Sequence, residues 1–265
     1  MIYEHLGGGV KRELAAVLAA RDEAISAGAV YGPVVRDLFI VECCTAGRGT
    51  VTINGKVFPL AAGDGMILFP GDIVLHTTEE PRDGVWCAVE GQAIARYLAR
   101  AGITHSQPYI PAKQVGAVKD CIERMLKAAH DADAGAYLRR DACAAALFGE
   151  LLADCPAAGG ADRSVEEALA FMETAYDDPG LSVTAIAARV GLTRSYFSVL
   201  FAKKTGMPPH TYLNELRVRK ALALMSEGNL PVARAAEAVG LAPENCARVV
   251  RRHAGKTPRE AVGAR

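Results

Sequence analysis

The sequence has no uninterrupted apolar stretch long enough to cross a membrane, although 51% of its residues are hydrophobic. A membrane-spanning helix needs roughly 18 or more such residues in a row, so we expect no transmembrane segment. The first eleven residues also lack the charged start and apolar core of a signal peptide. Together these absences predict a cytoplasmic protein.

Motifs for catalysis and metal binding are missing as well. The chain has no catalytic-triad pattern, no phosphate-binding loop and no GxGxxG turn. Metal-dependent cupins bind an ion with two or three histidines and a glutamate from neighbouring strands. Residues 38–89 contain a single histidine, His76, and the chain has no His-x-His pair. We therefore expect no catalytic residue, no metal and no cofactor.

The cysteines disfavour disulfide scaffolds and zinc ribbons, because all seven are scattered and form no CxxC pair. Reduced thiols in a cytosolic protein are the simplest interpretation. The adjacent Cys43 and Cys44 either form a redox sensor or alternate across a strand, one buried and one at the edge. We favour the second interpretation.

What the sequence does have is an internal repeat in its C-terminal third. Residues 181–209 align without a gap with residues 230–258, and eight of the 29 positions are identical. Such a repeat indicates one supersecondary unit used twice. The identical pairs are Leu181/Leu230, Val183/Val232, Ala187/Ala236, Val190/Val239, Gly191/Gly240, Leu192/Leu241, Gly206/Gly255 and Pro209/Pro258.

The repeated unit has the pattern of a helix-turn-helix. In the first copy a short apolar-periodic helix ends at Gly191, and Thr193 is a candidate N-cap for the next helix. Two short helices joined across a glycine-containing turn are typical of DNA-binding proteins. Residues 211–226, between the copies, are predicted to form one helix about 24 Å long. That length would place two reading helices on one DNA face, about a helical turn apart.

The net charge of zero conceals two oppositely charged parts. Residues 181–265 contain fourteen of the thirty Lys/Arg but only five of the thirty Asp/Glu, a net charge of +9, so the rest of the chain carries −9. A basic domain suits contact with phosphates. Double-stranded DNA is therefore the expected partner of the C-terminal part.

The N-terminal half has the period of strands. Turns are predicted at 47–49, 62–65 and 70–72, and Asn54-Gly55 is a strong hairpin signal. Five or more short strands at this spacing predict a small antiparallel barrel or jelly roll. A helix is predicted ahead of them, at residues 11–26. The predicted strands are 38–44, 50–53, 56–60, 66–69, 73–76 and 85–89.

Helical spacing returns at residues 115–129 and 138–152, and these amphipathic helices could pack on the barrel or on a second copy of themselves. Residues 154–162 are Pro/Gly/Ala-rich and predict a linker. Ser164 and Glu167 predict a capping box that opens the next helix. We expect an α+β protein, with an N-terminal antiparallel barrel and flanking helices in residues 1–160 and an all-α tandem helix-turn-helix domain in residues 161–265.

Residues 164–262 resemble the DNA-binding domain of the AraC/XylS family of bacterial transcription regulators. The resemblance is carried by LSVTAIAARVGLTRSYFSVLFAKKTGMPP, YLNELRVRKALALM and the closing GKTP. The cupin-like sensor domain that many of these regulators carry is similar to ECCTAGRGTVTINGKVFPLAAGDGMILFPGDIVLH. The resemblance implies a sequence-specific regulator controlled by a small-molecule effector in the barrel.

In the first unit, residues 194–203 would enter the major groove. The apolar side of this helix is predicted to be core and consists of Tyr196, Phe197, Leu200 and Phe201. By resemblance, bases would be contacted by Arg194, Ser195, Ser198 and Val199. Arg194 suits a phosphate as well as a guanine, and Lys203 is expected to contact phosphate.

In the second unit, residues 243–253 would present Glu244, Ala247, Arg248 and Arg251, with Arg248 at the position of the family's base-contacting arginine. Asn245, Cys246 and Val250 depart from the family because aromatic residues usually stand there. Between the units, Arg217, Arg219 and Lys220 are expected to be structural or to contact phosphates.

Effector contacts are predicted for Arg36, Glu42, His76 and Trp86, although a lone histidine at a strand end is more often structural. Two alternatives remain open. The first is a metal-dependent cupin enzyme fused to a DNA-binding domain; the second is a DNA-binding protein without a ligand, whose barrel serves only for dimerisation. A homodimer is expected, RNA polymerase is a candidate partner, and a membrane is not.

Overall fold

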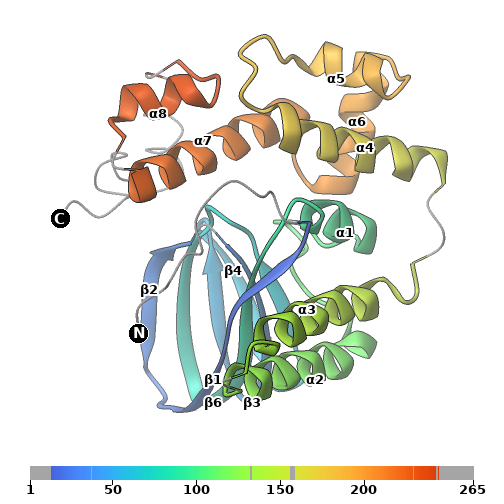
Figure 1. The fold of residues 1–265 in the computed structure, drawn as a ribbon. Coiled ribbons are helices and arrows are strands. Elements are labelled where there is room, and N and C mark those ends of the chain that lie inside the picture. The colour runs from blue at the N-terminus through green and yellow to red at the C-terminus, as the bar shows by residue number, and fades with distance from the viewer. Residues whose placement is uncertain are drawn as a thin grey trace.

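The computed structural model describes residues 13–36, 38–131, 133–155, 159–228, 230–242 and 244, in a β-rich N-terminal part and a helical C-terminal part (Figure 1). The N-terminal part contains a six-stranded antiparallel sheet in the order β1-β6-β3-β4, with β2 also paired to β6 and β5 to β3. Its strands are β1 (Ala15–Ile25), β2 (Val30–Val35), β3 (Phe39–Ile53), β4 (Lys56–Ala61), β5 (Gly65–Leu68) and β6 (Ile73–Glu90).

The long strands β3 and β6 run through two predicted breaks. The turn predicted at 47–49 is wrong, because these residues lie within β3 opposite β6. A Cβ atom added to Gly47 would lie 1.9 Å from the carbonyl oxygen of Pro81. One added to Gly49 would lie 2.2 Å from the carbonyl oxygen of Thr77. Glycine therefore serves close strand approach at these bulges rather than a turn. The separate strands predicted at 73–76 and 85–89 are likewise one strand, β6.

The hairpin predicted at Asn54-Gly55 is confirmed. The β3–β4 pairing continues up to Ile53 opposite Lys56. Asn54 has φ 50° and Gly55 has φ 83°, the positive values that a type I′ turn requires.

The helix predicted at residues 11–26 is wrong, because residues 15–25 form β1 along β6. Ala19 is buried in the core shared with α2 (Ala112–Ala129) and α3 (Ala136–Leu152). The amide of Ala16 donates a hydrogen bond to Asp141 of α3, 2.9 Å away. Pairing with a long strand overrides the helix propensity of an alanine-rich segment.

Alternation along β3 directs its side chains into two apolar cores. Val41 and Cys43 face the helices, whereas Ile40 and Cys44 pack inside the barrel. Both thiols are buried, so the prediction that one lies at a strand edge is wrong. The described cysteines are free thiols.

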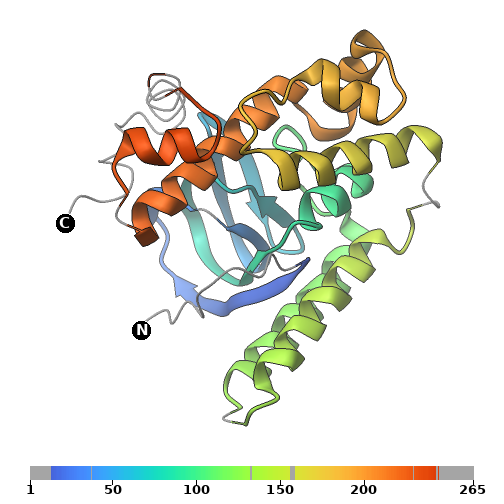
Figure 2. The same cartoon turned by 45° about the horizontal axis from the view of Figure 1, so that its top comes forward.

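The helices predicted at 115–129 and 138–152 are confirmed as α2 and α3, which lie side by side against the sheet (Figure 2). A shorter helix, α1 (Ile94–Ala101), follows β6 and packs on α4 (Gly160–Ala175) of the C-terminal part. Within the described part of the chain, no helix is long and apolar enough to span a membrane.

The C-terminal part continues with α5 (Val183–Arg189), α6 (Arg194–Thr205), α7 (Pro209–Gly228) and α8 (Val232–Ala238). The long connecting helix predicted at 211–226 is confirmed as α7. The predicted capping box is wrong, because α4 begins at Gly160 and Ser164 already lies in its second turn, where its hydroxyl donates to the carbonyl of Gly160. Gly160 of the predicted linker is thus already the first residue of a helix.

Candidate effector cavity and DNA interface

The barrel encloses a cavity of about 400 Å³ in which polar groups converge on an apolar wall. The residues predicted for effector contact, Arg36, Glu42, His76 and Trp86, all line it. Such a cavity is typical of small-molecule sites. The other lining residues are Asp22, Ile25, Tyr31, Val34, Leu38, Ile40, Leu68, Phe69, Asp72, Val74 and Arg82.

Glu42 of β3 and His76 of β6 bond to each other within the cavity wall. His76 Nε2 lies 3.0 Å from Oε2 and 3.3 Å from Oε1 of Glu42. An ionised carboxylate only accepts hydrogen bonds, so Nε2 is the donor in this contact. His76 Nδ1 is buried and has no hydrogen-bond partner among the described residues, which leaves this nitrogen for a ligand.

Two further carboxylates hold parts of the wall in place. The Trp86 indole N–H donates to Asp22, at 3.3 Å. Asp72 accepts bonds from the Asn54 amide group at 2.7 Å, the Phe69 backbone amide at 3.0 Å and the His105 ring at 3.0 Å. Asp72 thus fixes the turn between β5 and β6 at one side of the cavity.

Arg82 also lines the cavity, and the sequence did not indicate it. Because the predicted strands stop at residue 76 and resume at 85, Arg82 is assigned to a connection. The continuous strand β6 places it instead in alternation with Trp86, and its residue is only 9% exposed. The signal was the same period-two alternation, extended three residues back from the predicted strand at 85–89.

No group of three or more His, Cys, Asp or Glu side chains in the described part of the chain is arranged to hold a metal ion. Glu42 and His76 bond to each other, and the carboxylate of Asp72 is engaged by protein donors.

In the first helix-turn-helix unit, both helices have side-chain N-caps. Ser182 accepts a bond from the amide of Ala185 at 3.2 Å, and Thr193, as predicted, accepts one from Tyr196 at 3.4 Å. Gly191 adopts φ 71° in the turn, a value that few other residues tolerate. These caps and the turn fix the angle between α5 and α6.

The buried residues of α6 are Phe197, Phe201 and Thr205, and the two phenylalanines pack against α4 and α5. Tyr196 is 55% exposed, so its predicted place in the core is wrong. Only a narrow stripe of α6 is covered by its neighbours, and Tyr196 lies outside it. Leu200 is partly buried against the same core.

The opposite side of α6 carries the residues predicted to contact DNA. Arg194, Ser195 and Lys203 are exposed, and Val199 is 71% exposed. Ser198 is half-buried, and its hydroxyl donates to the carbonyl of Arg194 at 2.8 Å. The structure therefore brings these five side chains to one helix and leaves Val199 as its most prominent apolar group.

The second unit is described through α8 and up to its turn. Ala235, Ala236 and Val239 pack against α7, and Glu244 is exposed. The other predicted contacts, Ala247, Arg248 and Arg251, lie outside the described residues, as do the departures at Asn245, Cys246 and Val250.

Arg217 of α7 has a structural role. Its residue is 6% exposed, and its guanidinium donates to the carbonyls of Tyr176 and Asp178, each at 2.6 Å. Burial lowers the pKa of this guanidinium. Arg217 thereby fastens the connecting helix to the loop between α4 and α5.

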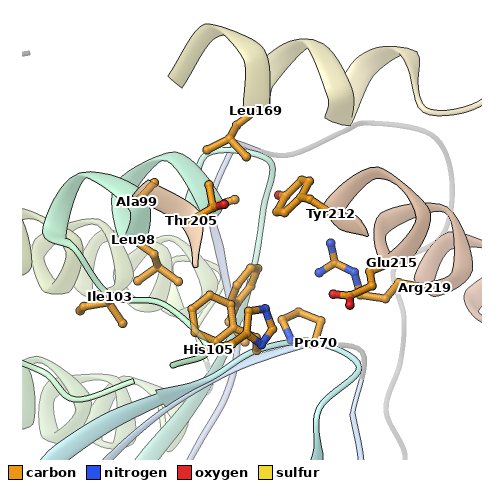
Figure 3. Close-up of a pocket in the computed structure, with 13 residues that line it drawn as sticks. Pro70, Leu98, Ala99, Ile103, His105, Leu169, Thr205, Tyr212, Glu215 and Arg219 are labelled. Carbon is orange, nitrogen blue, oxygen red and sulfur yellow. The ribbon is translucent and has the colours of Figure 1, made fainter. Parts of the chain in front are cut away.

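The two parts of the chain meet along α1, α7 and the turn after β5. Figure 3 shows His105 and Pro70 facing Tyr212, Glu215 and Arg219 of α7 around a small pocket. This pocket measures only about 30 Å³, room for roughly one or two waters. Arg100 of α1 adds an ion pair with Glu166 of α4 at 3.0 Å.

Comparisons with known proteins agree with this division. Residues 20–153 match the family model of the AraC-like ligand binding domain, and residues 186–263 match that of a helix-turn-helix domain. The first match alone spans half of the chain. The protein therefore belongs to the AraC family of transcription regulators, with a ligand-binding domain followed by a DNA-binding domain.

Two similar proteins regulate operons. The Msm operon regulatory protein of Streptococcus mutans is 23% identical over 243 residues, which cover 87% of this chain and 86% of that protein. The Lactose operon transcription activator of Staphylococcus xylosus is 25% identical over 210 residues, covering 74% and 72%. Among solved structures, an apo variant of ToxT from Vibrio cholerae has a TM-score of 0.53 at 9% identity, covering 94% of this chain and 97% of that one. This last likeness shows a shared fold.

Proposed function

We propose that this regulator binds a small-molecule effector in the barrel cavity and that binding changes its affinity for DNA. The observation that carries the proposal is the cavity of about 400 Å³ with Glu42, His76 and Trp86 in its wall. The pocket between the two parts is far smaller, about 30 Å³. Of these two pockets, the barrel cavity is the one with space for an organic molecule.

The turn from Phe69 to Asp72 supports a route from the cavity to the DNA-binding domain. Phe69 lines both the cavity and the pocket at α7. His105 stacks on Phe69 with ring centroids 4.1 Å apart. A Cβ on Gly71 would lie 3.6 Å from Cγ of Arg219 on α7. A ligand that moves Phe69 would therefore act on the helix that joins the two reading units, provided it favours one arrangement over the other.

For DNA we propose direct readout by Arg194, Ser195, Ser198 and Val199 of α6, with Lys203 on a phosphate. Four of these five side chains are exposed on one helix, with the half-buried Ser198 beside them, and this supports the proposal. In the second unit we propose Glu244, Ala247, Arg248 and Arg251, on the strength of the repeat. Replacing Arg248 by alanine should relax sequence preference, whereas Lys203→Ala should weaken all duplexes alike and lower the salt dependence by about one ion. Equal weakening of cognate and scrambled duplexes by Arg248→Ala would make the second unit an electrostatic clamp.

We further propose a cytoplasmic homodimer with a domain boundary near residue 160, and RNA polymerase as a candidate partner. Tyr137 and Leu138 are exposed apolar residues on α3, which supports contact with a second copy there. Sedimentation of the wild type against a Leu138→Glu variant tests this, and a monomeric wild type would contradict it.

The decisive experiment has two stages. Genomic fragments bound by the purified protein would first define a cognate duplex. That duplex is then titrated by fluorescence anisotropy with and without compounds that bind the cavity. Trp86 is the single tryptophan of the chain and lies in the cavity wall, so its emission reports binding independently of DNA. Compounds that alter Trp86 emission yet never alter DNA affinity would favour the ligand-independent alternative, and their chemical conversion would favour the enzyme.

A further inference from the structure

Arg82 is the charged group in the cavity wall that the described residues leave without a partner. It projects from β6 on the same face as Trp86, and its residue is 9% exposed. No described residue forms a hydrogen bond or an ion pair with its guanidinium. A guanidinium carries a positive charge and only donates hydrogen bonds. None of the Arg82 nitrogens is among the fully buried unpaired atoms of the described residues, so the charge faces the space of the cavity.

The nearby acids are engaged with other partners. Glu42 holds His76, Asp22 holds the Trp86 indole, and Asp72 holds three donors of its own surroundings. Asp83, next to Arg82 on the chain, accepts a bond from the amide of Ala24 at 2.7 Å.

The Cys44 thiol is a further acidic group close to Arg82, and it is neutral at physiological pH. Burial raises the pKa of Cys44, while the nearby guanidinium lowers it by less. The thiol donates to the carbonyl of Ala46 at 3.3 Å. Cys44 therefore supplies no countercharge to Arg82.

We infer that the effector is a small organic acid whose carboxylate pairs with Arg82 and whose body lies against Trp86 and the apolar wall. This inference rests on the proposed function of the cavity. A carboxylate matches the guanidinium fork and forms two parallel bonds. Ile40, Leu68 and Val74 supply the apolar wall for the body of the ligand. An amine would be repelled by Arg82, and a neutral ligand would leave its charge uncompensated.

The first test needs no ligand. Arg82→Met removes a charge that no described side chain compensates but keeps the side chain's length, so the ligand-free variant should melt at or above the melting temperature of the wild type. Arg48→Met is the matched control, because Arg48 is an exposed arginine of the same sheet that pairs with Glu79 and Glu80. A melting temperature of Arg82→Met clearly below that of the wild type would mean that Arg82 is a structural residue, and would overturn the inference.

The second test uses matched pairs of acids and their amides, among them benzoate with benzamide and phenylacetate with phenylacetamide. Each is titrated into the full-length protein while Trp86 emission is followed. The acids should bind roughly tenfold or more tightly than the amides, and Arg82→Met should abolish that preference while Arg48→Met retains it.

The outcomes separate the two proposals. Amides that bind as well as their acids would overturn the acidic ligand but leave effector control standing. A panel in which neither member of any pair changes Trp86 emission would count against both.

Discussion

Replacing Arg217 by alanine should destabilise the protein without changing the salt dependence of its DNA affinity. The guanidinium makes two bonds to the carbonyls of Tyr176 and Asp178, each 2.6 Å long, at a site where the residue is 6% exposed. Hydrogen bonds with a charged partner contribute about 1.5–3 kcal/mol each. Removing the guanidinium also relieves its desolvation, so we expect a net loss of about 3 kcal/mol for Arg217→Ala.

That loss is measurable. For a chain of this size, about 3 kcal/mol corresponds to a fall of roughly 6–12 °C in melting temperature. Lys220→Ala is the matched control on the same helix, because Lys220 is more exposed and lies 3.6 Å from Glu173. A pair of that kind contributes about 0–1 kcal/mol.

The DNA assay separates a structural arginine from a phosphate contact. The logarithm of DNA affinity falls linearly with the logarithm of salt concentration, and losing one phosphate contact reduces the slope by about one. Arg217→Ala should keep the wild-type slope at temperatures where it remains folded. A variant with unchanged stability and a slope lower by about one would refute the structural role.

Three further results are expected. Thr193→Ala should lower the free energy of unfolding by about 1 kcal/mol because the cap on α6 is lost, and Thr193→Ser should not; urea titration measures both, and equal loss in the two variants would contradict the cap. Gly49→Ala should lower the melting temperature, because its Cβ would lie 2.2 Å from the Thr77 carbonyl oxygen, whereas Gly116→Ala on α2 meets nothing within 4 Å and should gain roughly 0.5–1 kcal/mol; a neutral Gly49→Ala would show that β6 can move away. Burial raises the pKa of Cys43 to about 12, so its thiol should stay protonated and escape iodoacetamide at pH ~8 until the protein unfolds, as mass spectrometry would show; alkylation as fast as that of the partly exposed Cys155 would argue against it.

Features that depend on neighbouring residues were predictable from the sequence. The Asn54-Gly55 hairpin, the Thr193 cap and the long connecting helix each depend on a few adjacent residues whose conformational preferences are strong. The helix-turn-helix repeat was visible because its glycines and apolar positions recur at a fixed offset.

Features that depend on a distant partner were not. Residues 15–25 form a strand only because β6 is long enough to pair with them. Gly47 and Gly49 have the composition of a turn. Glycine is required there because a Cβ atom would lie 1.9 Å (Gly47) or 2.2 Å (Gly49) from a carbonyl oxygen of β6, and this contact is visible only in the structure. Tyr196 has the spacing of a core residue, but the described helices leave it 55% exposed. Arg82 lines the cavity because β6 continues through residues that the sequence assigns to a connection.

Residues of the N-terminal part contribute to the core of the DNA-binding domain. This limits how the domains of such proteins can be exchanged. Ala99 of α1 packs in the same apolar cluster as Leu169 and Phe197. A Cβ on Gly206 would lie 2.8 Å from the side chain of Thr104, so that glycine is matched to a residue about a hundred positions earlier. A chimera joined at the 154–162 segment would therefore take one side of this contact from each parent, and the two sides would not be matched to each other. A domain exchange must therefore include the residues on both sides of this contact. Substitutions on its two sides are expected to be acquired as pairs.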